Sequence, residues 1–187
     1  MDILLMGPPG AGKGTQGAIL AEALGLPKFA TGDLLRDAVQ RGTPLGLKAK
    51  AAMEAGHLVS DDIILGVVRD ELGKPEASQG VLFDGVVRTI PQAEGMAAIL
   101  TEKGRALTHV LFFDVTDEEI LSRLEKRRSL ENRKDDDPAA VAVRLKAYRD
   151  QTAPVLSHYE RQGLVRHIPA AGAVDDIARR VRSAIGR

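Results

Sequence analysis

A stretch rich in glycine, with one lysine and one threonine, lies near the start of the chain. Residues 7–15 read Gly-Pro-Pro-Gly-Ala-Gly-Lys-Gly-Thr, between an apolar run at 3–6 and a helical pattern that begins near Gln16. Glycines let the backbone turn its N–H groups around an anion, and the following helix adds the positive end of its dipole. Lys13 supplies an ammonium group and Thr15 a hydroxyl, one residue later than is usual in such loops. We therefore expect a phosphate-binding loop, the alternative being a glycine-rich turn with a surface lysine.

Asp84 comes directly after the apolar run 81–83 and before Gly85, so it is expected at the end of a strand. An acid at this position in proteins with such a loop lies near the Mg²⁺ of the bound nucleotide. We expect Asp84 to hold Mg²⁺ through water, with Thr15 as a second candidate. The alternative is that Asp84 forms a turn.

Several arginines follow one another in the second half of the chain. Arg123 and Arg127 are spaced for one helix face, Arg133 lies in a polar segment, and Arg144 lies in the next helical pattern. Phosphoryl transfer spreads negative charge over several oxygens, so converging arginines would suit it. Without the glycine loop, the simplest interpretation of these arginines would be a solvent-exposed helix face whose charges pair with nearby acids such as 135–137. Together with the glycine loop they favour a phosphoryl-transfer site.

Composition narrows the classes of function. The chain has 187 residues, 26 Lys or Arg, 26 Asp or Glu and no cysteine. A net charge of zero gives no reason to expect nucleic acid or a membrane as a partner, and zinc held by thiolates is excluded. No stretch approaches the ~20 apolar residues of a membrane span. We expect a soluble, cytoplasmic monomer.

Short apolar runs alternate with long helical patterns. The runs at 3–6, 28–30, 81–83, 110–115 and 165–168 are expected as strands of a central parallel five-stranded sheet, with helices on both faces, in a three-layer α/β fold. One domain, 1–187, is expected, with a helical insert at 30–59 and a short polar loop at 127–137. A long helical segment should run from Asp137-Pro138 to Gln162, and Pro154 should kink or divide it.

Taken together, these motifs resemble adenylate kinase, of the P-loop nucleoside monophosphate kinases, nearly end to end. The segments that carry the resemblance are residues 7–16, 31–36, 56–59, 84–85 with Arg88 and Gln92, Arg123 with Arg127, 132–133, 135–136, 144–145, Tyr148, 152–154, Gly172 and 174–176. The segment at 127–137 would be the short lid of this family, without the cysteines of the zinc-bearing long form, and 30–59 would be the AMP-binding insert.

The resemblance implies the reaction Mg·ATP + AMP ⇌ 2 ADP, with ATP, AMP and ADP as partners and Mg²⁺ as the cofactor. The implied ATP-binding residues are Gly10, Ala11, Gly12, Lys13, Gly14, Thr15, Arg123, Arg127 and Gly172. The implied AMP-binding residues are Thr31, Arg36, His57, Leu58, Val59, Gly85, Val86, Val87, Arg88, Gln92, Arg133 and Arg144. The implied catalytic side chains are those of Lys13, Arg88, Arg127, Arg133 and Arg144.

The sequence departs from the family between Gly85 and Arg88. The family usually has an aromatic residue and a cis proline there, whereas this chain has Val86-Val87. A cis bond before a residue other than proline costs ~2.5–4 kcal/mol, so we expect either strain or a trans bond that moves Arg88. The second outcome predicts a raised KM for AMP that Val87→Pro partly restores. A kinase for another nucleoside monophosphate, and a nucleotide-binding module with weakened catalysis, are the alternatives.

Overall fold

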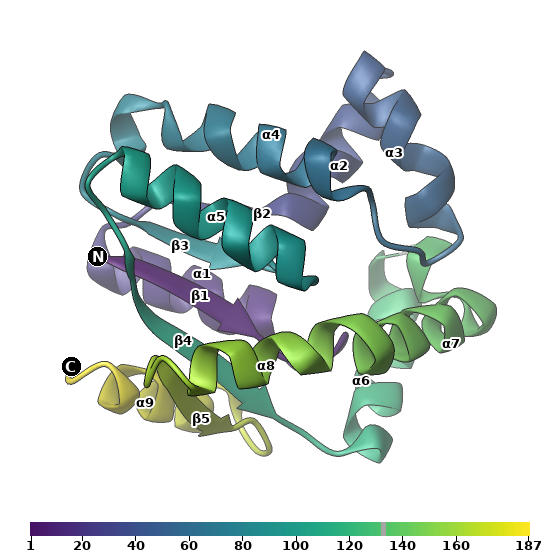
Figure 1. Ribbon diagram of the computed structural model, residues 1–187. Helices are drawn as coiled ribbons and strands as arrows, with labels where there is room; N and C mark the ends of the chain where they lie inside the picture. The colour runs from purple at the N-terminus through teal and green to yellow at the C-terminus, as the bar shows by residue number, and fades with distance from the viewer. Residues whose placement is uncertain (132–133) are drawn as a thin grey trace.

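The computed structural model describes residues 1–131 and 134–187. The short apolar runs form strands: β1 (Asp2–Met6), β2 (Lys28–Ala30), β3 (Val81–Asp84), β4 (Leu107–Asp114) and β5 (Val165–Pro169). Within the described residues these strands make a five-stranded parallel sheet in the order β2-β3-β1-β4-β5 (Figure 1). The α/β fold class predicted from the sequence is confirmed.

The central strand β1 is apolar at every position because both of its faces are covered. Leu4 and Met6 belong to a core cluster that includes side chains of the helices α4 (Asp61–Leu72), α5 (Ile90–Glu102) and α8 (Ala153–Glu160). Ile3 and Leu5 belong to a second cluster with α1 (Lys13–Leu24) and α9 (Val174–Ala184). Alternate residues of a strand point to opposite faces, so β1 contributes to both clusters. The three layers of Figure 1 follow from this alternation.

The remaining helices lie toward the carboxyl end of the sheet. They are α2 (Thr31–Gln40), α3 (Pro44–Glu54), α6 (Asp117–Glu131) and α7 (Pro138–Ala147), with a short 3₁₀ turn at Lys134–Asp136. A second 3₁₀ turn, Pro75–Ala77, precedes β3 at the amino end of the sheet. In Figure 1 the arrowheads of the strands point toward this group of helices. Parallel sheets bind ligands outside the carboxyl ends of their strands. None of the described helices is both long and apolar enough to cross a membrane.

The expectation of a polar loop over 127–137 is wrong in its first part. Helix α6 continues through Glu131, and Lys134–Asp136 form a 3₁₀ turn. The stretch from Arg127 to Glu131 contains Arg, Leu and Glu, which favour helix, and no glycine or proline that would end it. Polarity alone therefore did not indicate a loop.

The long helical segment is divided, as Pro154 predicts. Helix α7 passes into a π-helical turn at Tyr148–Thr152, and α8 begins at Ala153. Proline has no N–H for the helical hydrogen bond, and its ring fits the first turn of a helix. The division at this point lets Thr152 turn its hydroxyl to the main-chain oxygen of Arg88, 3.0 Å away.

Candidate functional site

The glycine loop joins β1 to α1 and is held against neighbouring backbone. Gly7 and Gly10 have φ angles of 141° and 82°, in the region that favours glycine. A Cβ at Gly7 would lie 3.0 Å from the Phe113 oxygen, and one at Gly10 would lie 3.1 Å from the Ile120 oxygen. Side chains are thus excluded at these positions by both conformation and space. The loop predicted from the sequence is present, with α1 beginning at Lys13.

Lys13 lies inside the curve of this loop. Its Nζ donates hydrogen bonds to the main-chain oxygens of Gly7 at 2.7 Å and Pro8 at 2.8 Å. Burial lowers the pKa of Lys13 to about 8, opposed by the negative charge of Asp84 and assisted by the positive charges of Arg88 and other arginines. The ammonium group is therefore held in a partly desolvated, cationic place, where an added polyphosphate would stabilise its charge.

Asp84 ends β3 beside the glycine loop. Its Oδ2 lies 3.6 Å from where a Cβ on Gly14 would be and 3.9 Å from Lys28 Nζ. Thr15, one residue further along α1, has an exposed side chain. A carboxylate and a hydroxyl are the hard oxygen ligands that Mg²⁺ prefers. The residues at this place fit the ion that the sequence predicts.

Three of the predicted arginines come from α6 and α7. Arg123 donates to the main-chain oxygens of Ala170 at 2.7 Å and Ala11 at 3.3 Å, so it lies over the end of the glycine loop. Arg127 makes a bidentate pair with Asp136, both N···O distances being 2.6 Å. Arg144 donates to Asp136 Oδ1 at 2.8 Å. Arg133 lies outside the described residues.

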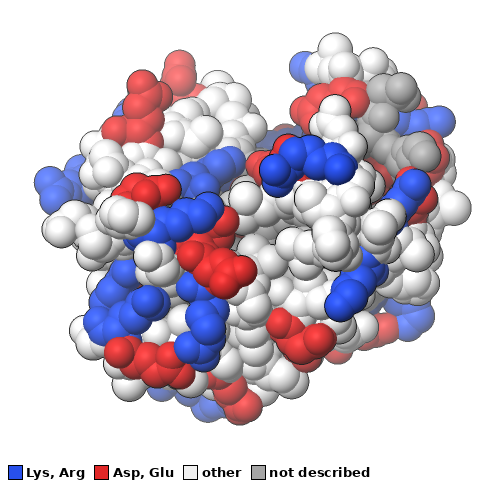
Figure 2. Space-filling view, turned by 90° about the horizontal axis from the view of Figure 1, so that it is seen from above, with Lys and Arg blue, Asp and Glu red and all other residues white. Residues whose placement is uncertain are grey.

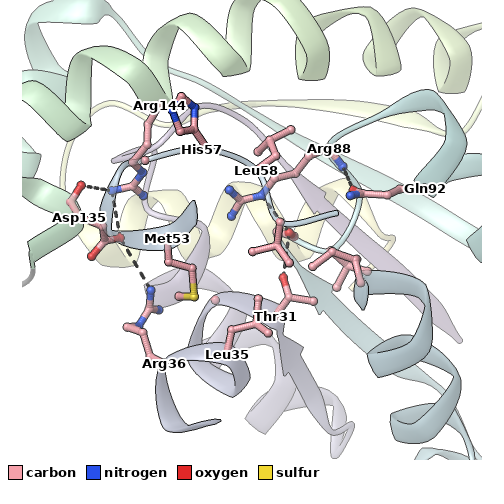
Figure 3. Close-up of a pocket in the computed structure, with 16 residues that line it drawn as sticks. Thr31, Leu35, Arg36, Met53, His57, Leu58, Arg88, Gln92, Asp135 and Arg144 are labelled. Carbon is pink, nitrogen blue, oxygen red and sulfur yellow. Dashed lines mark hydrogen bonds and ion pairs between the residues drawn. The ribbon is translucent and has the colours of Figure 1, made fainter. Parts of the chain in front are cut away.

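The acidic partners of Arg127 and Arg144 are largely buried, whereas Glu119, the partner of Arg123, has a side chain that is 37% exposed. The Asp136 side chain is fully buried, and Asp135 bridges Arg144, at 3.2 Å, and Arg36, at 3.8 Å (Figure 3). The alternative interpretation, pairing with nearby acids, is therefore correct for Arg127 and Arg144, but both arginines also line the cleft that Lys13 and Arg88 line. Buried arginine–carboxylate pairs fix the guanidinium planes in position.

A second pocket opens between β3, α2 and the residues after α3. Its lining contains these predicted AMP-site residues: Thr31, Arg36, His57, Leu58, Val59, Gly85, Val86, Arg88, Gln92 and Arg144. Thr31 donates its hydroxyl to the Gly85 oxygen at 2.9 Å, which joins the start of α2 to the end of β3 (Figure 3). Apolar side chains of Leu35 and Met53 complete the wall. A planar ring beside charged groups would fit such a lining.

The peptide bond between Val86 and Val87 is trans, as are all the described peptide bonds. Both valine side chains are buried in the core, and Arg88 still lines both pockets. Arg88 Nε donates to the Gly85 oxygen at 3.1 Å, and burial lowers the pKa of Arg88 to about 10, assisted by the charge of Arg144. The raised KM for AMP stays a prediction, which Val87→Pro tests.

The two pockets share part of their lining. Residues that border both include Arg36, Arg88, Arg144, Gly32, Gly56, Leu58 and Gly85. The larger pocket adds residues 9–16, Arg123, Arg127 and Gly172, and it includes Val87. Cationic side chains therefore lie where the two pockets meet. On the face drawn in Figure 2, basic and acidic side chains are interspersed over the surface.

Sequence reasoning missed some residues of this region. Lys28 was taken only as a strand residue, yet its Nζ lies 3.3 Å from the Gly14 oxygen. Asp61 was not predicted as a site residue, yet its Oδ1 accepts a hydrogen bond from Gln92 Nε2 at 2.8 Å. Neither residue lies in a motif with the site residues, and only the pairing of β2 with β3 and of α4 with α5 brings them there. No spacing signal in the sequence could have found them.

Comparison with known proteins gives a consistent result. A family model described as adenylate kinase matches residues 5–164. The chain is 45% identical to the adenylate kinase of Gemmatimonas aurantiaca, over 99% of each chain. It is 43% identical to that of Xanthomonas oryzae pv. oryzae, over the full length of both. It is 44% identical to that of Thermus thermophilus, over 98% of this chain and 96% of the relative.

Proposed function

This chain belongs to the adenylate kinase family, and from that premise we propose that it catalyses Mg·ATP + AMP ⇌ 2 ADP. The observation that carries the proposal is the junction of the two pockets. One pocket is bordered by the glycine loop and Lys13, and the other contains Gln92 and apolar side chains. Arg88 and Arg144 line both pockets. Phosphoryl transfer needs donor and acceptor held close together with positive charge around the moving group.

The donor nucleotide would bind along the glycine loop. The N–H groups of residues 10–15 and Lys13 would hold its phosphates, Arg123 and Gly172 would border its base, and Arg127 would face its outer phosphate. Asp84, through water, and Thr15 would hold Mg²⁺, which supplies charge neutralisation on the phosphates. The support is the position of Asp84 beside Gly14 and the two hydrogen bonds that place Lys13 in the loop.

The acceptor AMP would bind in the second pocket. Arg36, Arg88 and Arg144, together with Arg133, would hold its phosphate by bidentate hydrogen bonds, and Gln92 would meet the adenine edge. Thr31, the 57–59 segment and the 85–87 turn would form the walls. The catalytic arginines would shield the transferring group from water, because a phosphoryl donor open to water would be hydrolysed. The pocket lining supports this assignment.

The proposal includes the organisation of the chain. Residues 30–59 would be the AMP-binding insert and 127–137 the lid of a single domain, 1–187, that acts as a cytoplasmic monomer. Contact between the two segments supports it: Arg36 in the insert lies 3.8 Å from Asp135. Size-exclusion chromatography with light scattering tests the monomer, which a mass near twice 20.0 kDa would contradict.

A coupled assay of ADP formation tests the function. Purified protein would be given Mg·ATP with AMP, CMP, UMP or GMP in parallel reactions. We expect turnover with AMP and a strong preference for it over the other three. Preference for another monophosphate would indicate a kinase of different specificity, which the relatives' names do not favour. Tight ATP binding without turnover would indicate a weakened module.

A further inference from the structure

Gln92, at the start of α5, has its side-chain amide fixed on both sides. Its Oε1 accepts a hydrogen bond from the Arg88 main-chain N–H at 2.7 Å (Figure 3), and its Nε2 donates to Asp61 Oδ1 at 2.8 Å. The residue is 2% exposed. Asp61 is the first residue of α4, so the amide lies between two elements that are distant in the sequence.

The two partners allow only one orientation of this amide. A main-chain N–H can only donate, and an ionised carboxylate can only accept. If the oxygen and nitrogen of Gln92 exchanged places, a donor would face the Arg88 N–H and an acceptor would face the Asp61 carboxylate. Both contacts would be repulsive in a partly buried place, where unsatisfied polar groups are costly. The orientation therefore follows from the neighbours.

Thr89 ties Asp61 to the same turn of α5. Its hydroxyl donates to Asp61 Oδ1 at 2.9 Å and accepts from the main-chain N–H of Gln92 at 3.2 Å. The Asp61 oxygen that receives Gln92 is thus held by a second hydrogen bond. The group formed by Asp61, Thr89, Gln92 and the Arg88 N–H is one connected network, which we call the Gln92 network.

The Gln92 network leaves one N–H and one oxygen lone pair of the amide free. A glutamine amide has two N–H donors and two acceptor lone pairs, and the network uses one of each. The edge of adenine offers an amino donor beside a ring nitrogen that accepts, which is the complement of the remaining pair. A 6-oxopurine offers an acceptor beside an N–H, which would meet the amide in the wrong orientation.

We infer that Asp61 is a positioning residue that sets the preference of the monophosphate pocket for 6-aminopurines over 6-oxopurines. It acts through Gln92, whose amide it holds in the orientation that adenine requires. This inference rests on the proposed function, because it takes Gln92 as the group that meets the base. A site that hydrogen-bonds one pattern rejects the opposite pattern because buried polar groups are then left unpaired.

The test compares Asp61→Ala with Asp62→Ala. Asp62 is an exposed residue in the same first turn of α4, so the control removes the same charge from the same helix start. Equilibrium binding of AMP and of inosine monophosphate, which carries the 6-oxo group, would be measured for both variants and for the wild type, with ATP turnover alongside.

For Asp61→Ala we expect AMP affinity to fall about tenfold, the loss of a hydrogen bond to a charged group. Affinity for inosine monophosphate should change less than about threefold, since its pattern gains nothing from Asp61. The AMP preference therefore falls by several-fold, while kcat at saturating AMP and KM for ATP stay within about twofold. Asp62→Ala should leave all of these values within about twofold.

Two further variants separate positioning from folding. Asp61→Asn keeps an acceptor oxygen of the same shape, so it should recover most of the AMP preference. Asp61→Ser keeps a polar group at the helix start but is one bond shorter, and it should resemble Asp61→Ala. If Asp61→Ala does not fold, the Asn and Ser variants carry the comparison.

Equal AMP preference in the wild type and in Asp61→Ala or Asp61→Ser would overturn the inference. A parallel loss of AMP, inosine monophosphate and ATP binding would also overturn it, because that pattern indicates a structural role. Failure of the proposed function looks different: the wild type itself would then form no ADP from ATP and AMP.

Discussion

The glycine loop holds the Lys13 ammonium group in a fixed position. Its ammonium group is held by two main-chain oxygens and adjoins Asp84 and Arg88, so it is positioned before any phosphate arrives. Preorganised charge of this kind acts mostly on the transition state. Lys13→Ala should therefore reduce kcat more than tenfold, above ~1.4 kcal/mol, with an unchanged thermal midpoint. Lys103→Ala, at an exposed position after α5, is the control. Retention of more than about a tenth of kcat would show that the assigned role is wrong.

The lowered pKa of Lys13 predicts how ATP binding depends on pH. Because the pKa is about 8 in the free protein, Lys13 is mostly neutral above pH 8, while a bound polyphosphate would stabilise the ammonium form. Binding above pH 8 must then take up a proton, so ATP affinity should fall as pH rises through 8–10. Calorimetry at pH 9 in two buffers of different ionisation enthalpy measures this uptake, and Lys13→Ala should remove it. Equal binding heats in both buffers would refute the lowered pKa.

At the residue scale, the sequence identified side chains with a specific motif but not their partners. Lys13 and Asp84 were predicted from their positions and Gln92 from the resemblance to the family, and each lines one of the two pockets. The carboxylate partners of Arg127 and Arg144 were weighed only as evidence against a site, because spacing does not say whether a pair is buried. The Asp136 side chain is fully buried, which required the fold of the whole region.

Among the elements, the contact between the insert and α7 is unusually close. Gly56, after α3, has φ of 76°, and a Cβ there would lie 2.6 Å from the Ala140 oxygen and 3.1 Å from Arg144 Cγ. Gly56→Ala should displace Arg144 from the pocket, so KM for AMP should rise at least fivefold. Steady-state kinetics with varied AMP at saturating ATP measures the change.

Gly42→Ala provides a matched control for that substitution. Gly42 follows α2 in the same insert with φ of 65°, and a Cβ there would meet nothing within 4 Å. Both variants bear the backbone cost of a positive φ, of order 1–2 kcal/mol, and Gly56→Ala alone adds the close approach to the Ala140 oxygen. Only Gly56→Ala should change KM for AMP. An equal rise in both would mean that strain, not the contact with α7, is responsible.

Some element boundaries are defined by local chemistry. Gly25 ends α1 in the left-handed conformation, and Thr89 caps α5 by accepting from the Gln92 N–H, so both ends follow from single residues. Helix α6 ran further than predicted, through Glu131. The residues from Arg127 to Glu131 favour helix and include no glycine or proline that would end it, which is why the prediction of a loop failed there.

At the scale of the whole molecule, a buried ion pair that stabilises the fold lies at the opposite end of the sheet from the pockets. At the amino end of the sheet, Arg105 Nε donates to Asp2 Oδ2 at 2.9 Å, and the Asp2 side chain is 4% exposed. Arg105→Ala would leave a buried carboxylate without its cation and should lower the free energy of unfolding by ~3 kcal/mol. Urea denaturation measures this change. KM for both nucleotides should not change, because the pockets lie at the opposite end of the strands.

An exposed ion pair is the control for Arg105→Ala. Arg69 pairs with Glu102 at 2.5 Å, and both side chains are more than half exposed. Arg69→Ala should cost less than ~1 kcal/mol. If Arg105→Ala also lowered the free energy of unfolding by less than ~1 kcal/mol, the stabilising role assigned to the buried Arg105–Asp2 pair would be wrong.

The order of the strands was not predictable from single segments. Alternating runs and helices indicated a parallel sheet, but the order β2-β3-β1-β4-β5 depends on which strands pair after each crossover. Pairing is decided by contacts between residues such as Leu4 and Phe83, which are far apart in the chain. The comparisons confirmed the family that the motifs resemble.

The central claim is direct transfer of a phosphoryl group between two nucleotides bound in adjoining pockets. The test is to incubate the protein with unlabelled AMP and Mg·ATP that carries a radioactive label at the γ-phosphorus. The nucleotides are then separated, and the radioactivity of each is measured at early times. We predict that the label appears in the β-phosphate of ADP, with two ADP formed for each ATP consumed. Label released as inorganic phosphate, or ADP formation that does not depend on AMP, would contradict it.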